Sequence, residues 1–175
     1  MLRVGLCAMA IGGSSAAFVR PCALRAAAAC RIASRPLMSA AETEVKSFLE
    51  TALNAMGASA VSGDGATIDK WLKDYCADEG FFVRPSGNPL SFGGLKEMWT
   101  APDVTVTKSD LVSIDSIKVF ADGKAAVATY TMHDQFEYKG TPNDDYAKNT
   151  AVLEKVGDSW VWIQGHRGSG QPPPS

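Results

Sequence analysis

The chain has 175 residues, of which 46% are hydrophobic and 21% are charged, a composition typical of one globular domain. Five of its 17 basic residues lie in residues 1–40, which contain no Asp or Glu, so the remaining body holds 12 basic and 19 acidic groups and is a poor match to a nucleic-acid backbone. No apolar run approaches the roughly 18 to 20 residues that a membrane-spanning helix needs, so we expect no membrane partner.

Residues 1–40 have the composition of an organellar targeting presequence. They are rich in Ala, Ser and Arg, and a positive segment without acids suits import into an organelle. Mitochondrion and plastid are equally compatible with this pattern, whereas a secretory signal or an extension without function are the alternatives. We therefore expect a disordered presequence, a mature domain over residues 41–170, and a Pro-rich tail over residues 171–175.

Two helices are expected first. Ser39 and Glu42 have the spacing of a capping box, and apolar residues then recur every three or four positions. Gly57, with Gly63 and Gly65 beyond it, is expected to mark the end of the first helix. A second helix fits Thr67–Ala77. Its apolar face includes Trp71 and Tyr75, which belong to the core in the simplest interpretation but are large enough to line a cavity wall.

Strands dominate the rest of the chain. Residues 81–84 form a short strand, a Pro-rich turn follows, and Ser91 can cap a third, short helix. The later pattern predicts a long bulged strand over 104–120, strands over 125–138, 146–155 and 160–169, and a polar loop over 140–145. This order predicts an α+β domain in which N-terminal helices pack on a curved antiparallel sheet and enclose a pocket.

The order of elements resembles the nuclear transport factor two-like superfamily, particularly its SnoaL-like polyketide cyclase branch, over residues 42–170. The ending Asp158–Ser169 carries the resemblance: a tryptophan, an apolar strand, a His-containing polar triplet and a serine. A similar ending occurs in the association domain of calcium/calmodulin-dependent kinase and in iota-class carbonic anhydrases. The resemblance implies a cone-shaped fold, a homodimer formed through the sheet, and a pocket for small organic molecules. The resemblance does not determine which reaction, if any, the protein catalyses.

One position departs from that ending. The relatives place His two residues before the final Ser, but this chain has Arg167 there and His166 one residue earlier. Because side chains alternate along a strand, either Arg167 occupies the pocket or a bulge returns His166 to it.

The long strand over residues 125–138 offers two sets of catalytic candidates. If one face lines the pocket, Asp134 is a candidate base, Tyr130 can bind an oxyanion and Arg167 can anchor substrate. If the other face does, His133 takes the proton-transfer role and Gln135 orients the substrate. Aromatic content favours the first face. The structural alternative is that Tyr130 is core, Asp134 pairs with Arg167 and His133 is solvated.

No metal or cofactor is expected. His133, His166 and Cys76 are too few for a zinc site, Asn143–Asp145 is typical of a solvated turn, and no Gly-rich phosphate loop is present. Cys76 is expected to fill space in the core rather than to act as a nucleophile.

Three functions are compatible with the sequence. The first is an organellar SnoaL-like protein that binds a small apolar or carbonyl compound, with metal-independent isomerase, cyclase or dehydratase chemistry left open. The second is a non-catalytic module for homo-oligomerisation, and the third is a metal-free iota-type carbonic anhydrase, against which the absent His-rich ending counts. Candidate ligand-binding residues are Arg167, His166, Trp71, Tyr75 and Trp162.

Overall fold

The computed structural model describes residues 38–172. The predictions for residues 1–37 and for the last three residues therefore lie outside the described residues. Within that part, no helix combines the length and apolar character that crossing a bilayer requires.

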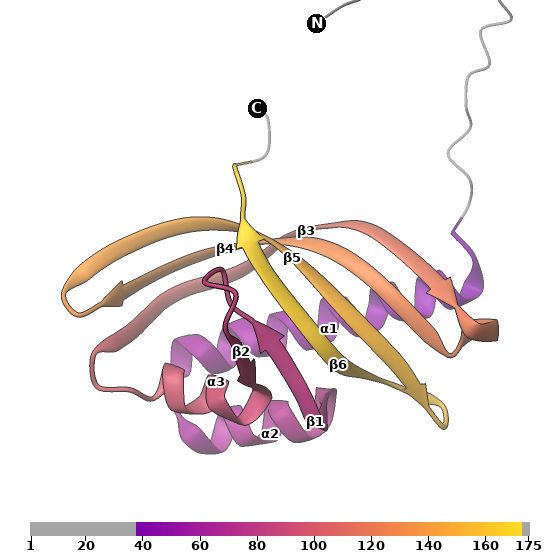
Figure 1. Ribbon diagram of the computed structural model, residues 1–175, viewed down its shortest axis with the longest axis horizontal. Helices are drawn as coiled ribbons and strands as arrows, with labels where there is room; N and C mark the ends of the chain where they lie inside the picture. Colours follow the sequence, from indigo (N-terminus) through magenta and orange to yellow (C-terminus); the bar gives the residue numbers. More distant parts are fainter. Residues whose placement is uncertain (1–37, 173–175) are drawn as a thin grey trace, which may run out of the picture. The chain divides into compact units, whose positions relative to one another are not determined.

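Three α-helices precede or interrupt the strands: α1 (Ala40–Ser62), α2 (Gly65–Tyr75) and α3 (Phe92–Trp99) (Figure 1). A single 3-10 turn, η1 (Ala121–Gly123), also lies among the described residues. The predicted capping box begins α1, since the Ser39 hydroxyl accepts from the Glu42 amide at 3.2 Å and the Glu42 carboxylate accepts from the Ser39 amide at 2.8 Å. Asp64 caps α2 and Ser91 caps α3 in the same way, each accepting a backbone N–H from the first turn.

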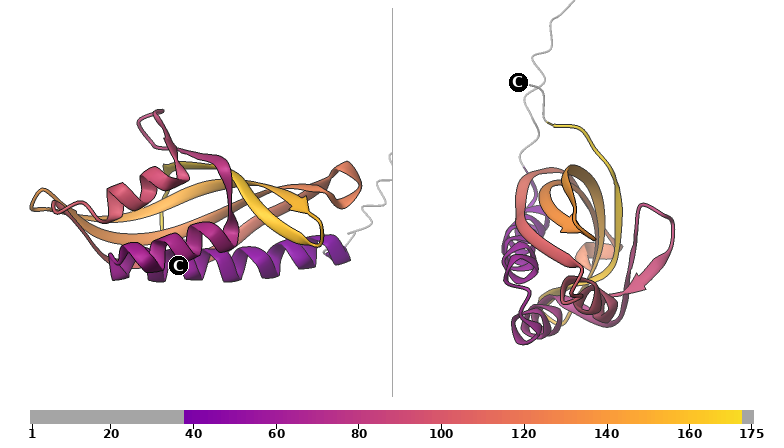
Figure 2. Two further views of the ribbon diagram at one scale, coloured as in Figure 1. Left: turned by 90° about the horizontal axis from the view of Figure 1, so that it is seen from below. Right: turned by 90° about the vertical axis from the view of Figure 1, so that its left-hand side faces the viewer.

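Six strands form one sheet in the order β2-β1-β6-β5-β4-β3. Their bounds are β1 (Cys76–Val83), β2 (Pro89–Ser91), β3 (Val104–Phe120), β4 (Ala125–Tyr138), β5 (Thr141–Val156) and β6 (Ser159–Ser169). The predicted α+β class is confirmed: the sheet curves, and the helices pack along one of its faces (Figure 2). The sheet is mixed rather than wholly antiparallel, because β1 leaves α2 in the same direction as its neighbour β6.

Gly57 does not end the first helix. The helix α1 continues to Ser62 and is ended by Gly63, whose φ of 60° lies in the left-handed region. Gly57 instead lies where α1 meets β3, and a Cβ built on it would be 2.0 Å from the carbonyl oxygen of Ser109. A glycine is required there because the helix backbone approaches the strand backbone directly.

The predicted polar loop over residues 140–145 is wrong. Pairing between β4 and β5 is continuous from Tyr138 opposite Thr141 onward, so the turn contains only Lys139 and Gly140. Gly140 has a φ of 76° and Lys139 a φ of 51°, which is the backbone of a tight hairpin turn. Asp144 and Asp145 therefore lie within a strand and point to opposite faces of the sheet.

The core between the helices and the sheet is built around Trp162. Its ring makes edge contacts with Trp71 and Tyr130, at centroid distances of 6.3 and 6.1 Å, and a tilted contact with Phe92 at 5.7 Å. Cys76 is buried nearby, and burial raises the pKa of its thiol to about 12. The thiol is therefore neutral near pH 7 and acts as a small apolar group.

Candidate functional site

A cavity of about 520 Å³ lies between the inner face of the sheet and the helices. That volume is within the range of small-molecule sites. Its apolar wall comes from α1, α3 and the ends of β3 and β4, and includes Met56, Leu95, Met98, Trp99, Val104, Val106 and Phe136. Its polar groups include Arg84, Ser109, Tyr130, Asp134, Asp145, Asn149 and Arg167.

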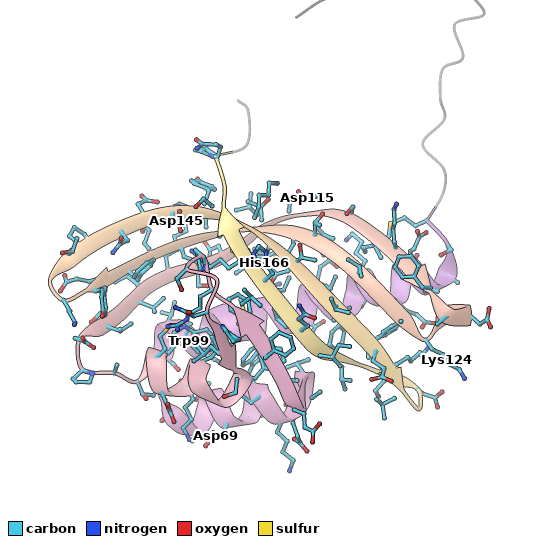
Figure 3. All side chains as sticks on the ribbon, in the orientation of Figure 1. Asp69, Trp99, Asp115, Lys124, Asp145 and His166 are labelled. Atoms are coloured by element: carbon cyan, nitrogen blue, oxygen red, sulfur yellow. The ribbon has the colours of Figure 1, made fainter. Side chains whose placement is uncertain are left out.

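The strand register brings most of these polar groups into two rows on the inner face. One row crosses the sheet through Tyr130, Asn149 and Arg167, and the other contains Asp134 and Asp145, with Met132 and Ala147 between the two rows. All five point inward because residues directly opposite each other in a sheet share a face. Asp145 and the apolar side chain Trp99 are labelled in Figure 3, on β5 and α3 respectively.

A bulge in β6 decides which residue of its end faces the cavity. Val152 pairs with Gln164 and Leu153 pairs with Trp162, so Ile163 is an extra residue without a partner. Trp162 faces inward, so simple alternation would also turn His166 inward. The extra residue shifts the alternation by one position, so that Arg167 faces inward and His166 faces outward. The bulge thus acts opposite to the one considered from the sequence, which would have returned His166 to the pocket.

Arg167 is the centre of a partly buried ion-pair network. It donates through Nη1 to Asp134 Oδ2 and through Nη2 to Asp145 Oδ2, the latter at 2.9 Å. The Ser109 hydroxyl donates to the other oxygen of Asp134 at 2.6 Å. Burial lowers the pKa of Arg167, but the two carboxylates outweigh burial and leave this pKa above its ordinary value. Both oxygens of Asp134 are engaged, so this carboxylate is held as an ion-pair partner rather than as an open base.

Tyr130 presents an unpaired hydroxyl to the cavity. The residue is only 1% exposed, and its hydroxyl makes no hydrogen bond with any residue from 38 to 172. Burial is the main reason that its pKa lies well above the ordinary value, so the phenol stays neutral and can donate a hydrogen bond. Asn149 lies beside it in the same row and is also buried.

The remaining predicted site residues lie elsewhere. His133 points to the outer face, where it is 2.6 Å from Asp144 and stacks on Tyr146 at 4.1 Å. His166 is exposed opposite Thr150 on the same face (Figure 3). Of the aromatic candidates, Trp162 lines the cavity and Trp71 is core, whereas Tyr75 lines a separate open depression of about 810 Å³ beside α1.

Four polar lining residues were not identified from the sequence: Arg84, Ser109, Asp145 and Asn149. Asp145 and Asn149 share a face with Ala147, but the run from Asp145 to Thr150 lacks the apolar–polar alternation that would have indicated a strand. Ser109 lies in the part of β3 where bulges break simple alternation. Arg84 follows a short strand, and no local pattern shows which way it points.

A family model described as "Protein of unknown function (DUF3804)" matches residues 50–173. The chain belongs to the DUF3804 family. No curated protein matches this DUF3804 chain.

Solved structures similar to the DUF3804 chain have the NTF2-like fold. An NTF2-like protein of unknown function from Prochlorococcus marinus is 28% identical, with a TM-score of 0.60 over 78% of this chain and 97% of its own. The CaMKII hub homology domain of Chlamydomonas reinhardtii is 23% identical, with a TM-score of 0.54 over 77% and 100%. A ketosteroid isomerase-like protein from Erwinia carotovora atroseptica is 14% identical, with a TM-score of 0.58 over 77% and 100%.

These similarities confirm the superfamily predicted from the sequence. The hub domain and the isomerase-like protein are less than 25% identical to the DUF3804 chain and therefore inform only about its fold. Because one of them is described as a hub and the other as isomerase-like, the shared fold does not choose between oligomerisation and small-molecule binding.

Proposed function

We propose that the DUF3804 protein binds a small, mostly apolar compound through a carbonyl oxygen in the cavity of β4, β5 and β6. The observation that carries this proposal is the hydroxyl of the buried Tyr130, which faces the cavity, is neutral and has no acceptor among residues 38–172. A buried donor is stabilised when a ligand oxygen accepts from it, because water cannot fully satisfy it in an apolar cavity. The surrounding Met and Trp side chains suit the apolar body of such a ligand.

The geometry supports binding more directly than proton transfer. Asp134, the expected base, is engaged by Arg167 and Ser109 on both oxygens. Neither His133 nor His166 is among the residues that line the cavity, so the iota-type carbonic anhydrase gains no support from the described part of the chain. Tyr130 as a neutral donor can polarise a bound carbonyl, which is the part of isomerase or cyclase chemistry that this cavity supplies.

Replacing Tyr130 with phenylalanine tests the proposal. We expect the neutral ketone fluorophore 6-propionyl-2-dimethylaminonaphthalene to bind with a blue-shifted emission, and Tyr130→Phe to weaken this binding about tenfold, as expected for one lost hydrogen bond. The unfolding free energy should change little because the hydroxyl has no protein partner to lose. Tyr138→Phe is the matched control, since Tyr138 lines the same cavity but is half exposed. Equal affinity of Tyr130→Phe and the wild type would refute the role of the hydroxyl.

We propose homodimerisation through the outer face of the sheet as a second property. The helices of the described chain cover only the inner face (Figure 2). The outer face carries Val127 opposite Val152, a neutral row of Thr129 opposite Thr150, and the partly exposed Val161. An uncovered face with apolar side chains at its centre is suited to pairing with a second copy around a two-fold axis.

The dimer is tested by its mass in solution. We expect light scattering after gel filtration to give about twice the 18.5 kDa of the full chain, and Val152→Glu to give the monomer mass. Lys118→Glu changes charge at the edge of the same face and should leave the dimer intact. A wild-type chain that is monomeric at high micromolar concentration would show that this face is not a homodimer interface.

A further inference from the structure

We infer that the natural ligand of the cavity is a monocarboxylate, and that Arg84 binds its carboxylate while Tyr130 binds a second oxygen. This inference rests on the proposed small-molecule function and adds the charge and the orientation of the ligand. One of the two cations that line the cavity, Arg84, has no carboxylate partner among the described residues.

Four charged residues line the cavity: Arg84, Asp134, Asp145 and Arg167. Three of them form the ion-pair network already described, which holds two carboxylates and one guanidinium. Arg84 forms no ion pair with any carboxylate of residues 38–172. Its only side-chain hydrogen bond is from Nε to the Asn88 carbonyl oxygen at 3.5 Å, the outer limit of such a contact. The terminal nitrogens of Arg84 are therefore available to an anionic ligand.

The backbone of Arg84 is held by a closed turn. The Arg84 amide donates to the Asn88 carbonyl at 3.2 Å, and the Gly87 amide donates to the Arg84 carbonyl at 2.8 Å. Gly87 has a φ of 80°, which a side-chain-bearing residue rarely adopts, and Pro85 and Pro89 restrict both ends of the turn. A cation on a fixed backbone loses less conformational entropy when it binds an anion than one on a mobile loop does.

The charges also restrict what kind of anion fits. The network around Arg167 carries one net negative charge, and β6 places it between Arg84 and Tyr130, because Val83 pairs with His166 and Arg167 pairs with Asn149. Arg84 supplies one positive charge, which balances a carboxylate but only part of a phosphate dianion. The planar guanidinium also matches the two oxygens of a carboxylate. The apolar body of the ligand would then lie against Met98 and Trp99 of the cavity wall.

The test compares an acid with its neutral ester. The probes are 5-oxodecanoic acid and its methyl ester, which share a flexible apolar chain and a ketone and differ in charge at neutral pH. Their affinities are measured by displacement of the ketone fluorophore from the full chain. We expect the wild type to bind the acid about tenfold more tightly than the ester. Arg84→Gln should bind both equally and keep the wild-type affinity for the ester.

Two further variants separate charge from geometry. Arg84→Lys keeps the charge but loses the planar fork, so we expect it to retain only part of the preference for the acid. Lys118→Gln removes a cation from the outer face and should leave the preference unchanged.

Each other outcome overturns the inference in a recognisable way. Equal binding of acid and ester by the wild type shows that the cavity does not select a carboxylate, while small-molecule binding itself still holds. A preference that survives in Arg84→Gln places the carboxylate at another cation. If neither the fluorophore nor the ester binds the wild type, the proposed function fails, and this inference fails with it.

Discussion

Replacing Arg167 with methionine is expected to lower the free energy of unfolding by about 3 to 4 kcal/mol. The change removes the guanidinium that pairs with Asp134, a residue that is only 8% exposed. Methionine preserves most of the side-chain volume, so the loss reflects an unpaired buried carboxylate rather than an empty space. Urea denaturation of the full chain near pH 7 measures the effect.

Two companion variants show whether the buried charge is the cause. The double variant Asp134→Asn with Arg167→Met removes both members of the pair and should regain much of the lost stability. Asp145→Asn removes the other partner of Arg167. Because the Asp145 side chain is 44% exposed, this substitution should lower the free energy of unfolding by less than about 1 kcal/mol. A double variant that is as unstable as Arg167→Met alone would show that Asp134 is not the group left unsatisfied.

Replacing Gly57 with alanine is expected to destabilise the protein by about 2 to 3 kcal/mol, although alanine is the better helix former by roughly 1 kcal/mol. The new methyl group would lie 2.0 Å from the Ser109 carbonyl oxygen, so α1 and β3 must separate. Backbone atoms cannot move aside as a flexible side chain can. Because Ser109 also donates to Asp134, we expect ligand affinity to fall together with stability.

Gly93 offers a matched control for that substitution. It is an exposed glycine in α3, and the nearest atom to its Cβ would be the Ser91 hydroxyl at 3.9 Å. Gly93→Ala should therefore stabilise the protein by up to about 1 kcal/mol. The opposite signs of the two substitutions, measured by the same urea denaturation, distinguish steric contact from helix propensity. A stabilised Gly57→Ala would mean that α1 does not approach β3 as closely as described.

The proposed carbonyl site and the proposed carboxylate site lie in the same cavity. A ligand would place its carbonyl oxygen against Tyr130 and its carboxylate against Arg84, while the Asp134–Arg167–Asp145 network maintains the polar end of the cavity. In this arrangement Arg167 is a structural cation, whereas the sequence had suggested it as the substrate anchor. The distinction is physical: Arg167 already has two carboxylate partners, and Arg84 has none in the described chain.

Local patterns were sufficient for most of the secondary structure. The capping box at Ser39 and the alternation along β4 each depend on residues close together in the sequence. Alternation alone also put Tyr130 and Asp134 on one face, and their aromatic and apolar neighbours predicted that this face is the inner one. The superfamily followed from the same order of helices and strands.

Only the tertiary structure decided which other side chains complete the site. The bulge at Ile163 reverses the parity of β6, and a bulge depends on pairing with β5 rather than on the sequence around it. Asp145 joined a strand because β4 opposite it was long enough to pair with it. The close contact at Gly57 and the position of Arg84 in the cavity wall depend on contacts between segments far apart in the chain. The sequence thus determined the elements and the inward face of β4, whereas long-range pairing and close packing decided that Arg167, not His166, faces the cavity.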